Sequence, residues 1–127
     1  MIQIPKSSAS KIHKISQSVL KEVITNLHLP PGWILQFVDT EHLYEEYGVT
    51  YKIDVYARWR YKSEKYELFV EVQKNESEKE FLEKMHYFIN LNKCDSKKIF
   101  NIVWEKDIPE NSLEMWDWLK GHIQVPW

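Results

Sequence analysis

The stretch "LFVEVQKN", residues 68–75, decides the fold that this sequence predicts. Side chains alternate between the two faces of a β-strand, so its three apolar residues at even positions point one way and Glu71 and Gln73 point the other. A basic, polar segment follows directly. The stretch therefore predicts a strand with one apolar face and with a carboxyl group and an amide on the opposite face.

The segments before this strand predict two further strands. Residues 50–59 ("TYKIDVYARW") show a similar alternation, and residues 33–39 ("WILQFVD") also have strand composition. Between them, "EHLYEEYG" predicts a helical turn closed by Gly48. Three strands in succession indicate an antiparallel meander.

Helical patterns are expected at both ends of the chain and after the third strand. The first helix follows a cap at Ser8 or Ser10, and its apolar stripe is formed by Ile12, Ile15, Val19, Val23 and Leu27. Residues 76–92 predict a second helix. The last helix follows Pro109, with Asn111 as its N-cap and Gly121 at its end.

Residues 98–104 ("KIFNIVW") form an apolar run of strand length, typical of a strand buried on both faces. A strand, a helix and a further strand in sequence indicate a crossover to a parallel neighbour. The whole order predicts an α/β fold, in which a mixed four-stranded β-sheet is flanked by helices. With 127 residues, the chain is expected to form one domain over residues 1–127.

Composition limits the kinds of partner and environment. The net charge of -2 gives no general basic field for binding phosphates, so any nucleic-acid site must be local. The single cysteine, Cys94, cannot form an internal disulfide, and a reduced, intracellular location is expected. The sequence shows neither a signal peptide nor an apolar run long enough for a membrane span, so a soluble protein with no membrane partner is expected.

The predicted hairpin brings acidic residues of two strands together. A four-residue turn at residues 62–65 would place Asp54 opposite Gln73, whereas a turn centred on Lys62 and Ser63 would place Asp54 opposite Glu71. In both registers the two carboxyl groups share one face with Gln73 and Tyr56. Mg²⁺ prefers oxygen ligands of this kind. The polar, solvated face of an ordinary antiparallel sheet would give the same alternation.

"KIDVYARW" followed by "LFVEVQKN" resembles the signature of the PD-(D/E)xK nuclease superfamily, in a Glu-x-Gln variant. The resemblance implies a restriction-endonuclease-like αβββαβ core and a site that binds Mg²⁺ or Mn²⁺. Its metal ligands would be Asp54, Glu71 and the carbonyl of Val72. Gln73 stands where the family has its catalytic lysine, and it would be the third catalytic residue beside Asp54 and Glu71. Lys74 is expected to point to the opposite face.

The same resemblance extends into the next helix and to the first one. Lys84 and Tyr87 match a lysine and an aromatic residue that would bind substrate, and Glu22 is the candidate for a glutamate that many members carry on the first helix. The five histidines show no metal-ligand spacing, so surface or boundary positions are expected for them.

The resemblance implies a metal-dependent DNA nuclease that hydrolyses phosphodiester bonds, with DNA as partner, homodimerisation, and a role in processing mobile-element or viral DNA. One alternative is a catalytically inactive nuclease-like module that binds DNA or protein, which the missing lysine and the acidic net charge favour. Another is an unrelated α/β domain whose hairpin imitates the motif.

Overall fold

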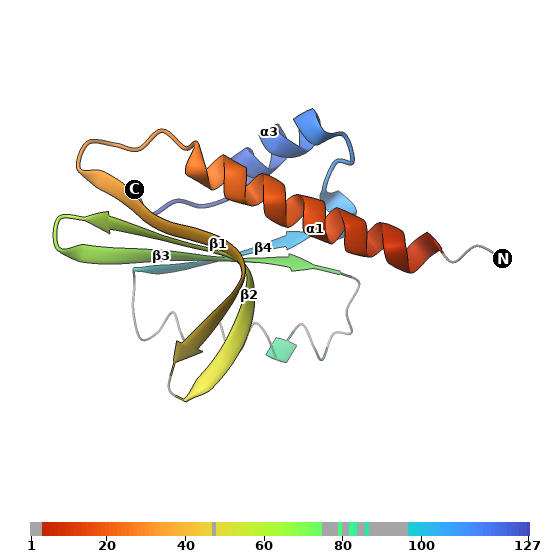
Figure 1. The fold of residues 1–127 in the computed structure, drawn as a ribbon, viewed down its shortest axis with the longest axis horizontal. Helices are drawn as coiled ribbons and strands as arrows, with labels where there is room; N and C mark the ends of the chain where they lie inside the picture. The colour runs from red at the N-terminus through yellow and green to blue at the C-terminus, as the bar shows by residue number, and fades with distance from the viewer. Residues whose placement is uncertain (1–3, 47, 75–78, 80–81, 84–85, 87–96) are drawn as a thin grey trace.

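The computed structural model describes residues 4–46, 48–74, 79, 82, 83, 86 and 97–127 (Figure 1). Its elements follow one another in the order α1 (Ile4–Thr25), β1 (Trp33–Glu46), β2 (Val49–Tyr61), β3 (Glu64–Gln73), β4 (Lys98–Trp104), the 3₁₀ helix η1 (Glu105–Asp107) and α3 (Ser112–His122).

The four strands form one sheet in the order β1-β2-β3-β4. The first three pair antiparallel as a meander, and β4 runs parallel to β3. The predicted α/β class and the mixed four-stranded sheet are therefore confirmed. The helix predicted over residues 76–92 falls mostly outside the described residues, so the specific restriction-endonuclease-like core stays a prediction.

The long hairpin of β1 and β2 corrects two local predictions. Residues 41–46 continue β1 instead of forming a helical turn, because each pairs across to β2 as far as Glu46 opposite Val49, with the exception of Glu41. Gly48, with φ 76°, makes the turn of this hairpin and caps no helix. Cross-strand pairing has overridden the weak helical preference of a glutamate-rich segment.

The turn between β2 and β3 is shorter than the four-residue turn that the sequence favours. Tyr61 pairs with Glu64, which leaves Lys62 and Ser63 as the turn, and Lys62 takes a φ of 57°. The pairing register is thus the alternative one, in which the residue numbers of opposed positions add up to 125. A lysine has accepted the left-handed backbone usually taken by Gly or Asn.

The strand β4 is less completely buried than predicted. Within the described part of the chain it is an edge strand, and burial is not continuous along it. Val103 belongs to the core, whereas Ile102 is only partly buried. An apolar run alone did not distinguish a central strand from an edge strand that has β3 on one side.

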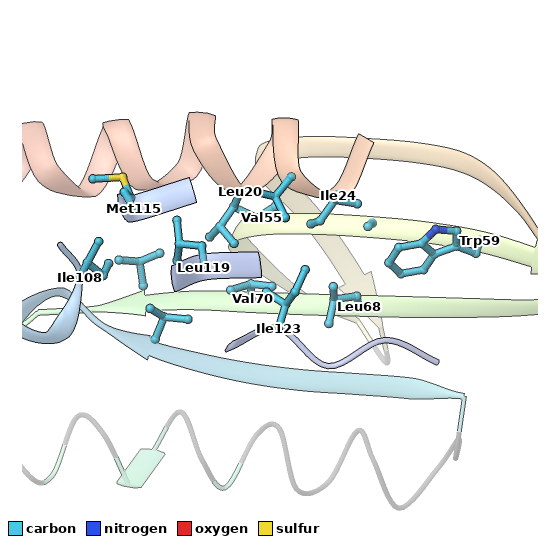
Figure 2. Close-up of a cluster of buried hydrophobic side chains, with 14 residues drawn as sticks. Leu20, Ile24, Val55, Trp59, Leu68, Val70, Ile108, Met115, Leu119 and Ile123 are labelled. Atoms are coloured by element: carbon cyan, nitrogen blue, oxygen red, sulfur yellow. The ribbon is translucent and has the colours of Figure 1, made fainter. Parts of the chain in front are cut away.

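The main core lies between the sheet and the two helices α1 and α3, which cover the same face (Figures 1 and 2). Val23 of the predicted stripe on α1 is fully buried, as expected. The buried face is nevertheless rotated from that stripe, since Leu20 and Ile24 are buried while Ile15 is 38% exposed. The helix also begins earlier than predicted, at Ile4, so that both proposed capping serines lie within it.

The last helix follows its sequence signals closely. The Asn111 side chain caps α3 by accepting hydrogen bonds from the amides of Leu113 and Glu114. Met115 and Leu119 are buried, and the tryptophans at 116 and 118 pack against the core. Gly121 lies inside the helix, which continues to His122.

The opposite face of the sheet carries a second buried cluster of Ile53, Tyr56 and Phe69. The Tyr56 hydroxyl donates a 2.5 Å hydrogen bond to the buried carboxylate of Glu67. Burial and this neighbouring carboxylate together raise the pKa of Tyr56 well above its ordinary value. No helix among the described residues is long and apolar enough to cross a membrane.

Candidate functional site

Asp54 lies where β2 separates from β3. The paired register of these strands runs from Tyr61 and Glu64 to Val55 and Val70, and Asp54 is the next residue beyond it. Beyond the end of the backbone pairing, the Asp54 side chain continues the contact between the strands, because its Oδ2 accepts a hydrogen bond of 2.8 Å from the amide of Val72. This hydrogen bond holds the Asp54 carboxylate against the C-terminal end of β3.

The backbone is irregular at Asp54, and this changes which face its side chain occupies. Ile53 packs in one cluster with Tyr56, although strict alternation would place residues three apart on opposite faces. Glu41, which would oppose Asp54, has a φ of 50° and is missing from the register between Thr40 and His42. The prediction that Asp54 and Tyr56 share a face is therefore wrong.

Asp54 points instead toward α1. His13 Nε2 lies 3.2 Å from Asp54 Oδ1, and Gln17 Nε2 lies 3.3 Å from the same oxygen. Burial acts to raise the pKa of Asp54, but the hydrogen bonds from His13, the Val72 amide and Glu71 outweigh it and lower the pKa below its ordinary value. Asp54 is thus a buried, ionised carboxylate held by several donors.

Glu71 meets Asp54 despite the broken alternation. Its position on β3 alternates with those of the core residues Val70 and Val72, yet its side chain hydrogen-bonds to Asp54. Both residues are buried, with 8% of Asp54 and 6% of Glu71 exposed. The predicted proximity of these two carboxyl groups is therefore present in the structure.

Two further charged residues complete the cluster around His13. The hydrogen bond with Asp54 outweighs burial and raises the pKa of His13, and the nearby carboxylate of Glu105 acts in the same direction. Glu105 Oε1 lies 3.9 Å from His13 Nδ1. Burial raises the pKa of Glu105, against the opposing effects of His13 and Lys74. Lys74 therefore acts electrostatically on the same cluster that contains Asp54.

The other predicted site residues have different fates. Gln73 is 1% exposed and lies opposite Trp104 of β4. Because the N–H and C=O of a residue in a strand point toward the same neighbour, the Val72 carbonyl is directed toward Asp54 like its amide. The two predicted substrate-binding residues, Lys84 and Tyr87, lie outside the described residues.

Glu22 does not reach the cluster. It lies five residues beyond Gln17 on α1, about 140° farther around the helix. There it is exposed, and with Lys14 and Ser18 it lines a groove on the outer side of α1. The place on α1 expected for Glu22 is occupied by His13 and Gln17.

The donor atoms suit Mg²⁺ in their chemistry, because carboxylate and carbonyl oxygens are the ligands it prefers. However, both oxygens of Asp54 already accept hydrogen bonds from protein groups. Within the described part of the chain, no group of three or more His, Cys, Asp and Glu side chains is arranged to hold a metal ion. A cation that uses Asp54 must therefore replace hydrogen bonds that its oxygens accept.

Four residues of this cluster were not predicted from the sequence to belong to the site: His13, Gln17, Lys74 and Glu105. A signal was present on α1, because positions 13, 17, 20 and 24 recur at spacings of four, three and four. Two polar residues therefore continue the stripe of Leu20 and Ile24 that faces the sheet. Nothing in the sequence marks Glu105, which enters the cluster through the pairing of β4 with β3.

Comparison with known proteins gives no match to a family model, to a curated protein or to a solved structure.

Proposed function

We propose that the protein is a metal-dependent phosphodiesterase that acts on DNA. The observation that carries this proposal is the contact between the carboxyl groups of Asp54 and Glu71, made where β2 separates from β3. Two carboxylates so close together are costly for a fold that does not use them, because only one can ionise readily.

The proposed roles follow from position. Asp54, Glu71 and the Val72 carbonyl would hold Mg²⁺ or Mn²⁺, and a bound cation would supply charge stabilisation and a lower pKa for water. Gln73 would orient the attacking water through its amide, which can donate and accept hydrogen bonds but carries no charge. Lys74 is a lysine whose positive charge acts on His13 and Glu105 of the cluster. It takes no part in the family motif.

DNA as the substrate has its support in local charge. Exposed lysines lie on the elements that supply the cluster, with Lys11 on α1, Lys74 after β3 and Lys106 in η1. They offer phosphate contacts near the carboxyl pair although the net charge of the chain is -2. Such contacts position a backbone without reading its sequence, so recognition would rest on DNA structure or on a second copy of the chain.

The direct test combines metal binding with DNA cleavage. Calorimetric titration with Mg²⁺ and Mn²⁺ should show binding to the wild type, and duplex, branched and single-stranded DNA should be cleaved slowly when the metal is present. Glu71→Gln keeps the shape of the side chain but removes the ligand charge, and should abolish both. Glu67→Gln is the matched control, because Glu67 is also a buried glutamate of β3 but bonds to Tyr56.

A second function, that of an inactive nuclease-like module binding DNA or protein, is favoured by a different observation. The Asp54 carboxylate is satisfied by His13, Gln17 and the Val72 amide without a cation. A buried polar network that is fully bonded can serve the fold alone. Absence of metal binding at millimolar concentration, together with absence of cleavage, would support this function over the nuclease.

A further inference from the structure

Three polar atoms from α1 and β2 form a nearly equilateral triangle. His13 Nε2 lies 3.2 Å from Asp54 Oδ1 and 3.2 Å from Gln17 Nε2, and Gln17 Nε2 lies 3.3 Å from Asp54 Oδ1. The spacing of His13 and Gln17, four residues apart on α1, brings both to the same oxygen.

Hydrogen bonding alone accounts poorly for this triangle. When His13 donates from Nε2 to Asp54, that nitrogen cannot also accept a hydrogen bond from the Gln17 amide. Two donors then approach one another at 3.2 Å and share a single acceptor. Both distances to Asp54 Oδ1 are also longer than the 2.7–2.9 Å typical of a charge-assisted hydrogen bond.

A cation accounts for the same geometry. The oxygen and nitrogen of an amide occupy interchangeable positions, so a half-turn of the Gln17 amide replaces its donor with an oxygen acceptor. The triangle then consists of an imidazole nitrogen, an amide oxygen and a carboxylate oxygen. In an octahedral site with bonds of about 2.1–2.3 Å, neighbouring ligand atoms lie about 3.0–3.3 Å apart. The observed edges have the dimensions of one face of such an octahedron.

Independent support comes from the other nitrogen of His13. A metal-bound histidine almost always donates its second ring N–H to a carboxylate or carbonyl. His13 Nδ1 and Glu105 Oε1 face each other at 3.9 Å, and both are buried atoms without a hydrogen-bond partner. A movement of about 1 Å by either side chain would join them. Glu105 is therefore placed where the carboxylate partner of a metal-bound His13 imidazole is expected.

We propose that α1 contributes two ligands, His13 Nε2 and Gln17 Oε1, to a cation bound at Asp54, and that this site prefers Mn²⁺ to Mg²⁺ and Ca²⁺. This inference rests on the proposed function and names its metal. An imidazole ligand favours a transition-metal ion, whereas Mg²⁺ and Ca²⁺ prefer oxygen ligands alone. Metal sites are usually identified by groups of three or more His, Cys, Asp and Glu side chains. The triangle has only two such side chains, His13 and Asp54, and its third ligand would be the amide of Gln17.

The test is spectroscopic and needs no activity. Mn²⁺ added to the wild-type protein should give an electron spin-echo modulation from one directly bound ¹⁴N nucleus. His13→Ala should remove this modulation and weaken Mn²⁺ binding at least tenfold by calorimetry. The control is His28→Ala, since His28 is exposed just beyond α1; this variant should leave both unchanged.

The second ligand is tested by a pair of substitutions at Gln17. Gln17→Glu keeps an oxygen at the same place and adds a charge, so it should strengthen binding of Mg²⁺ and Mn²⁺. Gln17→Met has a similar length but no suitable oxygen, and should weaken binding several-fold. Circular dichroism and thermal melting establish that each variant is folded.

The possible failures are distinguishable. Binding of Mn²⁺ that depends on Asp54 and Glu71, without ¹⁴N modulation and with His13→Ala unchanged, would overturn this inference and leave the nuclease proposal intact. The same holds if Mg²⁺ or Ca²⁺ binds as tightly as Mn²⁺. Absence of any metal binding would overturn both.

Discussion

The amide of Val72 donates a 2.8 Å hydrogen bond to Asp54 Oδ2. A side chain of β2 thus accepts the hydrogen bond of a β3 amide that lies beyond the last backbone pair of these two strands. This single contact ties the end of the β2–β3 ladder to the carboxyl cluster. It also connects the cluster to α1, because the other oxygen of Asp54 is bonded to His13 and Gln17.

The interaction of His13 with Asp54 predicts a loss of stability as pH rises. Because the pKa of His13 is raised in the folded protein, its contribution is fully present below the unfolded value of about 6.5 and disappears as pH rises through the folded value. Urea unfolding between pH 6 and pH 9 should show this decline for the wild type. His13→Gln cannot titrate and should give a flatter curve over that range; an equal decline in both proteins would contradict the assignment.

The rotated face of α1 predicts unequal effects of two similar substitutions. Leu20→Ala removes a fully buried side chain from the core and should lower the free energy of unfolding by about 2–5 kcal/mol. Ile15→Ala, on the same helix, should cost less than about 1 kcal/mol, because Ile15 is 38% exposed. Similar losses, measured by urea unfolding, would restore the stripe expected from the sequence.

Neighbouring residues of β4 provide a test of its place in the sheet. Val103→Asp should prevent folding or cost several kcal/mol, because it places an unpaired charge in the core between the sheet and the helices. Ile102→Asp should be tolerated better, since Ile102 is only partly buried. Thermal melting of both variants decides the matter, and a reversed order would mean that Ile102 has the drier environment.

The buried pair of Tyr56 and Glu67 should couple strongly. Tyr56→Phe removes the hydroxyl donor from a carboxylate that is 2% exposed, which should cost about 1–3 kcal/mol of stability. Glu67→Gln in the Tyr56→Phe background should recover part of the loss, because a neutral amide tolerates burial better than a carboxylate that has lost its hydroxyl donor. Purely additive effects in this double-mutant cycle, measured by urea unfolding, would show that the two side chains act independently.

The sequence predicted the meander, the parallel pairing of the last strand and the cap at Asn111, because each depends on local periodicity or on one capping side chain. It failed where the outcome depends on tertiary pairing. The glutamate-rich segment after Thr40 became a strand because β2 offered it a partner. The carboxyl pair was predicted from alternation, but Asp54 reaches Glu71 through an irregular strand end that no periodic rule describes.

The charges around His13 give a final test of the cluster that is independent of any function. Lys74 lowers the pKa of His13 and Glu105 raises it, although neither is close to His13 in the sequence. Lys74→Met should therefore raise the pKa of His13, and Glu105→Gln should lower it.

NMR titration of the His13 ring protons measures both changes, and the exposed His28 serves as an internal reference in the same spectra. Opposite displacements at His13 with none at His28 are expected, because the charge of Lys74 acts on the imidazole from the residue after β3 and that of Glu105 acts from η1. Equal displacement of both histidines would indicate a general change in charge. No displacement at His13 would mean that Lys74 and Glu105 do not act on this histidine.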